Sequence, residues 1–183
     1  MQLQQQSAVV GVFEDRKLAN EAIGALIAAG FAQKRIGAAM RYNVVESEVI
    51  DERLDAFAAA RAITDVLDGL GLRSLSGLGV SFQVIPILGP AIAVGTLREM
   101  LSFAEEKGAV SGLLETLRNA GIPDEQADIY QCEFEVGRTL VIVEAQGRQA
   151  EAATILRSRG GSDKISRNKV SLLGQRFAAS SVG

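Results

Sequence analysis

The sequence predicts an α+β protein, and three observations support this prediction. Residues 7–14 read as a short β-branched strand, residues 15–30 as an amphipathic helix and residues 36–42 as a second strand, which is the order of a right-handed βαβ unit. Residues 138–145 form a near-continuous apolar run, typical of a strand at the centre of a sheet. Residues 74–97 carry no charge. We therefore expect a sheet with helices, divided by an apolar insertion.

The first helix carries signals for both of its ends. Asp15 is a suitable N-cap, and Gly30 stands where a C′ glycine ends a helix. Its apolar face is made of Leu18, Ala22, Ile23, Leu26 and Ile27.

The insertion, about residues 46–134, is expected to be helical. Residues 46–70 read as a long amphipathic helix, with two Arg against seven acidic residues over positions 46–68 (net −5). Residues 100–120 read as a helix that breaks near Lys107, and residues 124–134 as another, with Ala127, Tyr130 and Phe134 on one face.

The uncharged stretch is the most unusual part of the insertion. Pro86 and Pro90 argue against one straight helix, so residues 86–90 read as a bend between two short apolar arms, each too short to span a bilayer. The free energy gained by burying its large apolar side chains exceeds the total stability of a typical domain, about 5–15 kcal/mol. These side chains therefore cannot stay in water. They must cover the sheet, meet another copy or enter lipid. The candidate contact residues are Leu78, Phe82, Ile85, Pro86, Ile87, Leu88, Pro90, Ile92 and Val94.

The C-terminal part completes the predicted domain. Residues 148–158 read as a helix, and residues 164–166 as a weak fourth strand of the sheet. The 183 residues favour one domain over residues 1–161, followed by a basic tail over residues 162–183. The candidate contact residues of this tail are Lys164, Arg167, Lys169 and Arg176.

Composition excludes several classes of enzyme. The chain has no histidine, which rules out catalysis by serine–histidine or cysteine–histidine pairs, and it has one cysteine, which rules out an internal disulfide. Neither phosphate-binding glycine motif occurs. Cys132 has acidic neighbours in sequence, which indicates an inert thiol, although cross-linking between protomers stays open. We therefore assign no catalytic, cofactor-binding or metal-binding residue, and expect a protein that is not an enzyme.

Several segments resemble bacterial general-stress-protein (YflT-like, heat-induced stress protein) domains. They are V-V-G-V-F-E-D-R-K-L-A-N near the start, I-P-I-L-G-P-A-I-A-V-G in the middle, and L-R-N-A-G-I-P-D-E-Q-A-D-I-Y with G-R-T-L-V-I-V-E-A later. The resemblance covers about residues 8–40 and 77–161. It implies a ferredoxin-like split βαβ sheet with a Gly/Pro-hinged helical insertion, and a stress-associated protein without catalytic residues. The basic tail is not part of the family pattern.

These observations lead to one expected function and two alternatives. We expect a non-enzymatic, stress-associated protein that forms a homo-oligomer or larger assembly through its apolar insertion. The N-terminal residues show no secretory signal, so a cytoplasmic location is expected. The first alternative is a peripheral protein of the inner membrane that inserts the hairpin of residues 86–90 into lipid, and the second is a small-ligand regulatory module.

The tail has three possible partners besides solvent. They are an acidic protein surface, an anionic membrane surface and nucleic acid. The net charge of −3 and the single aromatic residue of the tail, Phe177, disfavour nucleic acid.

Overall fold

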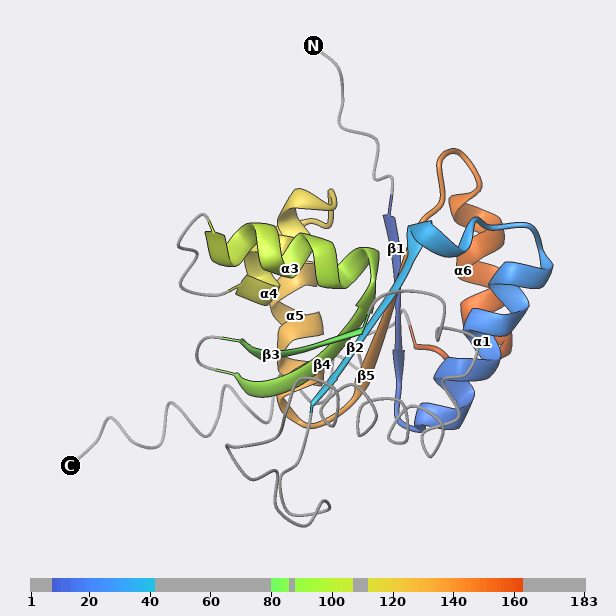
Figure 1. Ribbon diagram of the computed structural model, residues 1–183. Coiled ribbons are helices and arrows are strands. Elements are labelled where there is room, and N and C mark those ends of the chain that lie inside the picture. The colour runs from blue at the N-terminus through green and yellow to red at the C-terminus, as the bar shows by residue number, and fades with distance from the viewer. Residues whose placement is uncertain (1–7, 42–79, 86–87, 107–111, 163–183) are drawn as a thin grey trace.

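A five-stranded antiparallel sheet lies between two groups of helices in the computed structural model (Figure 1). The structure describes residues 8–41, 80–85, 88–106 and 112–162. The strands are β1 (Ala8–Phe13), β2 (Ile36–Arg41), β3 (Val80–Ile85), β4 (Gly89–Gly95) and β5 (Thr139–Glu144). Their order across the sheet is β1-β5-β2-β4-β3, and the α+β class is confirmed.

The predicted strand of residues 138–145 is central, as its sequence indicates. β5 pairs antiparallel with β1 on one side and with β2 on the other. β1 and β2 therefore run parallel to each other, with β5 between them. Val141 and Ile142 are completely buried, each against a different helical layer.

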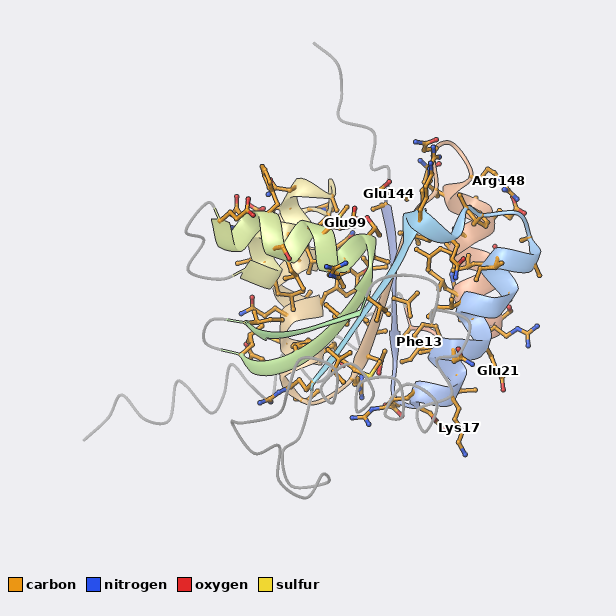
Figure 2. All side chains as sticks on the ribbon, viewed as in Figure 1. Phe13, Lys17, Glu21, Glu99, Glu144 and Arg148 are labelled. Atoms are coloured by element: carbon orange, nitrogen blue, oxygen red, sulfur yellow. The ribbon has the colours of Figure 1, made fainter. Side chains whose placement is uncertain are left out.

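One layer consists of α1 (Arg16–Ala28) and α6 (Gln149–Ser158), which lie side by side on the same face of the sheet (Figure 1). A single 3-10 turn, η1 (Gln33–Arg35), leads from α1 into β2. Phe13 points from β1 into this layer (Figure 2), where it packs with Ile23, Leu26 and Leu156.

Both predicted ends of α1 are confirmed. The Asp15 carboxylate accepts a hydrogen bond from the Lys17 backbone N–H at 2.8 Å, which satisfies one of the free donors at the start of the helix. Gly30 has a positive φ of 86°, and its N–H donates to the Ile27 carbonyl at 3.0 Å. Glycine adopts this conformation without steric cost, so it ends the helix.

The other layer consists of three helices from the insertion (Figure 1). They are α3 (Thr96–Glu106), α4 (Gly112–Asn119) and α5 (Asp124–Glu135). The predicted break near Lys107 falls between α3 and α4. Leu97, Leu117 and Phe134 are fully buried with Leu140 of β5 in one cluster. These three helices therefore cover the second face of the sheet.

The two apolar arms of the insertion are strands, which corrects the expectation that this part is helical. β3 and β4 form a hairpin that pairs from Val80 opposite Val94 to Ile85 opposite Gly89, and β4 also pairs with β2. The β-branched residues of this stretch favour strands. Pro90 stands near the start of a strand, where proline is tolerated.

The hairpin is joined to the core where β2, β4 and α3 meet. Gly37 of β2 pairs with Gly95 of β4, immediately before α3 begins. A Cβ atom on Gly37 would lie 2.4 Å from the backbone nitrogen of Leu97, so only glycine fits there. The buried Thr96 hydroxyl donates to the Glu144 carboxylate at 3.4 Å, which links the start of α3 to the end of β5.

Two predicted elements lie outside the described residues: the long helix of residues 46–70 and the weak strand of residues 164–166. The described chain does reach Ser162, which forms an antiparallel bridge with Val12 of β1. Gly161 allows this return, since a Cβ atom on it would lie 2.7 Å from the Leu156 carbonyl oxygen and 2.8 Å from Phe13 Cζ.

Candidate self-association site

The structure buries four of the nine candidate contact residues inside the chain itself. Ile85, Leu88, Ile92 and Val94 expose 4% of their surface or less. They belong to the two core clusters that join the sheet to its helical layers. These four residues cannot contact a partner or lipid while the chain is folded, so their assignment as contact residues is wrong. The sequence also allowed that the stretch covers its own sheet. That alternative is nearer to the observed structure, in which the stretch is itself part of the sheet.

The other five candidates are not placed in the same detail. Leu78, Pro86 and Ile87 lie outside the described residues. Phe82 is in β3 and Pro90 is in β4, and the structure describes their backbone alone. All four tail candidates, Lys164, Arg167, Lys169 and Arg176, also lie outside the described residues.

The backbone of β3 defines a different candidate site, at the end of the sheet. β3 pairs with β4, and no other described strand pairs with it. Its sequence, V-S-F-Q-V-I, has no charged residue and no proline. Natural proteins protect exposed edge strands with charges, prolines or bulges, because an unpaired edge is a template for another strand. β3 has neither a charge nor a proline, so its sequence does not oppose strand addition.

The register of the hairpin shows which backbone groups of β3 point outward. Val84 lies opposite Pro90. Proline has no N–H, so this pair cannot be a hydrogen-bonded pair, and pairs alternate along an antiparallel ladder. Ser81, Gln83 and Ile85 therefore exchange hydrogen bonds with β4. The N–H and C=O groups of Val80, Phe82 and Val84 are directed away from β4, toward the edge of the sheet.

At the opposite end of the sheet, the chain itself pairs with the edge of β1 at one residue. The Ser162 N–H donates to the Val12 carbonyl at 2.9 Å, and the Val12 N–H donates to the Ser162 carbonyl at 3.2 Å. α6 ends at Ser158, and the chain turns at the positive-φ residue Gly160 to bring Ser162 beside β1. The edge of β1 is thus paired at Val12 by a segment of the same molecule.

The charged side chains around the sheet form ion pairs that hold elements together. Arg138, at the start of β5, contacts Glu133 of α5 and lies 2.6 Å from Glu14 at the end of β1. Arg41 donates to the Glu135 carbonyl at 2.6 Å. These arginines link strand ends to α5, which is a structural role.

Arg148 has a similar role at the other end of the molecule, near the top of Figure 2. Its guanidinium donates to the Glu151 carboxylate at 2.7 and 2.8 Å and to the Ala29 carbonyl at 2.8 Å, and it lies 4.2 Å from the centre of the Phe31 ring. Hydrogen bonding raises the pKa of Arg148 and lowers the pKa of Glu151. The contacts join the start of α6 to the end of α1.

The environment of Cys132 agrees with the prediction of an inert thiol. Cys132 is exposed on α5 and forms no disulfide. Partial burial, followed by the negative charges of Glu135, Asp128 and Glu133, raises the pKa of its thiol. The reactive thiolate is therefore disfavoured at neutral pH. Cross-linking between protomers through Cys132 stays a prediction.

The described part of the chain shows no metal site or membrane-spanning helix. No group of three or more His, Cys, Asp or Glu residues in that part is placed to hold a metal ion. None of its helices is both long and apolar enough to cross a membrane.

Comparison with known proteins gives no match, since no family model fits the chain and neither a curated protein nor a solved structure matches it.

The sequence offered one signal for the β3 edge that the helical interpretation missed. Residues 80–85 and 89–95 are rich in valine, isoleucine and alanine and are separated by residues 86–88, at the length of a hairpin connection. Interpreting Pro86 and Pro90 as a helix bend concealed this pattern. No local pattern could have shown that β3 would lie at the end of the sheet, because that depends on which strands pair with β4.

Proposed function

We propose that this chain is a non-enzymatic protein that works by self-association, with the edge of β3 as its contact site. A single observation carries the proposal: the uncharged stretch contains the terminal strand β3, whose outward backbone groups have no partner among the described strands. Burying such groups without a hydrogen bond is costly, so they are either hydrated or paired with another strand. A neutral strand offers no charge against pairing.

The mode of contact differs from the one expected from sequence. The buried side chains of Ile85, Leu88, Ile92 and Val94 stabilise the chain's own core. The proposed contact instead uses the backbone of β3, so it needs no exposed apolar patch. The polar residues Ser81 and Gln83 are compatible with a strand that is alternately hydrated and paired.

We also propose that the core is ferredoxin-like. In such a split βαβ arrangement, the two parallel strands of each unit are separated by one antiparallel strand. Three observations support it: β5 lies between β1 and β2, α1 and α6 share one face, and the chain after α6 bridges β1 at Val12. A strand that continued from Ser162 would complete the second unit.

A cytoplasmic, stress-associated role stays part of this proposal and rests on the resemblance of the sequence alone. The residues that carry the resemblance have structural roles in this chain. Within G-I-P-D-E-Q-A-D-I-Y, Pro123 stands at the N-cap of α5, and Ala127 and Tyr130 face the core. This motif therefore supports a shared fold more directly than a shared activity.

The membrane alternative loses part of its basis. Leu88, within the hairpin turn expected to enter lipid, exposes 4% of its surface. Pro86 and Ile87 lie outside the described residues, so the alternative is kept as an outcome of the experiment. No observation among the described residues favours a small-ligand regulatory module.

Multi-angle light scattering after size-exclusion chromatography tests the proposed function. At micromolar concentration the chain should elute as a species of at least twice its 19.4 kDa mass. A concentration-independent monomer would contradict self-association. Flotation with anionic vesicles provides the second arm, since a monomer that floats with lipid would favour the membrane alternative.

A further inference from the structure

We propose that two copies of this chain pair through their β3 strands, antiparallel and centred on Phe82, to form one continuous sheet across a two-fold axis. This inference rests on the proposed function and adds the partner, the geometry of the contact and the number of copies in the assembly. The partner is a second copy of the same chain. The contact is a β-ladder between identical edges, in which each strand extends the sheet of the other.

The pattern of outward backbone groups sets the register. Val80, Phe82 and Val84 direct their N–H and C=O groups away from β4, as the Val84–Pro90 pair requires. These three positions are symmetric about Phe82. An antiparallel pair centred on Phe82 places Phe82 opposite its own copy and Val80 opposite Val84 of the other chain. Every outward group is then paired, whereas a shift by two residues leaves the groups of one end residue in each copy unpaired.

Charge favours a second copy as the occupant. In a two-fold pair, each residue of the edge meets a residue from the same strand, so a charged residue at its centre would face its own copy. β3 carries no charged residue, and residues 74–97 as a whole carry none. Self-pairing therefore opposes no like charges, which are unfavourable across a β-ladder.

The bridge at the other end of the sheet obstructs strand addition at Val12 and so favours a dimer over an open chain. Strand addition at both edges would give an open chain of molecules. The edge of β1 is instead bridged at Val12 by Ser162 of the same molecule. Among the described residues the β3 edge carries no such bridge, and a two-fold contact at β3 uses the same surface on both copies and closes the assembly.

Site-specific cysteines test the register directly. In the proposed ladder, Ser81 lies opposite Gln83 of the partner copy in a non-hydrogen-bonded pair, where the Cα atoms are about 4.5 Å apart, within the range of a disulfide. The experiment uses the full-length Cys132→Ser chain as background. Ser81→Cys and Gln83→Cys chains are mixed and exposed to a mild oxidant. The mixture should form a cross-linked heterodimer about tenfold more efficiently than either variant alone.

A charge pair tests the same register in equilibrium binding. A chain with both Ser81→Lys and Gln83→Lys places lysines opposite lysines in the dimer. A chain with Ser81→Lys and Gln83→Glu places lysine opposite glutamate. The first should dimerise about tenfold more weakly than the second. Circular dichroism and the melting temperature of both variants show that each is folded, so the difference reports on pairing.

The outcomes separate this inference from the proposed function. A parent dimer, cross-linking in the mixture and the stated order of the charge variants support the inference. A parent monomer overturns both proposals. A parent dimer whose mixture does not cross-link overturns the β3 ladder and leaves self-association standing. A parent assembly larger than a dimer overturns the closed two-fold arrangement.

Discussion

The two ends of the sheet differ in whether the outward backbone groups of the edge strand find a partner in the described part of the same chain. At the β1 end, the chain returns after α6, and Ser162 pairs with the backbone of Val12. At the β3 end, three residues direct their backbone groups outward, and no described strand meets them. An unpaired edge favours association, so a protein that needs to stay monomeric has a reason to protect both ends. This difference between the two edges is the observation on which the proposed β3 contact rests.

The largest expected effect comes from breaking the attachment of the β3 end to the rest of the sheet. In Gly37→Ala, the new Cβ would lie 2.4 Å from the Leu97 backbone nitrogen, so β2, β4 or α3 must shift. We expect a loss of about 3 kcal/mol in the free energy of unfolding, measured by urea denaturation.

Gly24→Ala is the matched control for this substitution. Gly24 lies in α1, where nothing is within 4 Å of a new Cβ atom, and alanine favours a helix. We expect a gain of up to about 1 kcal/mol. Equal effects of the two substitutions would show that the junction at Gly37 is not tightly packed.

The next largest effect is expected from removing the bridge between Ser162 and Val12 at the β1 edge. In Gly161→Ala, the new Cβ would lie 2.7 Å from the Leu156 carbonyl oxygen, which displaces the segment that pairs with Val12. We expect a loss of about 1–3 kcal/mol in stability. Hydrogen exchange of the Val12 amide should accelerate, while that of the Leu140 amide in the central strand follows global unfolding alone.

Gly161→Ala also tests whether the bridge at the β1 edge limits the size of the assembly. With both ends of the sheet open, strand addition no longer closes at two copies. Light scattering of Gly161→Ala should therefore show species larger than the parent assembly at equal concentration. A folded variant with exposed Val12 and an unchanged assembly size would show that the β1 edge has no part in limiting growth.

A smaller effect is expected from the ion pairs at the β1–β5 end. Arg138→Met removes contacts with Glu133, which is largely buried, and with Glu14, which is largely exposed. We expect a loss of about 1–2 kcal/mol for Arg138→Met, and less than about 1 kcal/mol for Glu14→Gln, because exposed ion pairs are screened by solvent. Urea denaturation of both variants checks the order, and a larger loss for Glu14→Gln would contradict it.

The smallest effect concerns Cys132, which lies on α5, at neither edge of the sheet. Its raised pKa keeps the thiol protonated, so alkylation should reach half its maximal rate at a higher pH than in an unfolded chain. Glu135→Gln should move the profile toward lower pH. The parent assembly should not depend on Cys132, and its dissociation by Cys132→Ser would contradict the assignment of the contact to β3.

Local patterns were sufficient for the first βαβ unit. Asp15 and Gly30 mark the ends of α1, and the run of residues 138–145 indicates a central strand; both predictions are confirmed. Ala127, Tyr130 and Phe134 face the core as their helical spacing predicts. In these segments the side-chain period and the end signals depend on neighbouring residues, so sequence is a good guide.

The candidate site depends on contacts that are distant in sequence. Ile92 and Val94 are apolar enough to require burial, and the sequence shows that, but it does not show that β2 and β3 are the strands beside them. Residue type therefore predicted correctly that these side chains must be buried. It did not show that they are buried within the chain's own core and not against a second copy or lipid. The free edge is a property of backbone pairing, which no side-chain pattern records.

The place of β5 has a consequence for how the protein is made. β1 and β2 have no hydrogen bonds with each other in the sheet, because β5, synthesised about a hundred residues later, separates them. On the ribosome, the N-terminal unit can form its helix early but must wait for Glu144 to emerge before its strands are joined. Pairing over such separations slows folding, so the nascent chain holds an incomplete sheet for most of its translation.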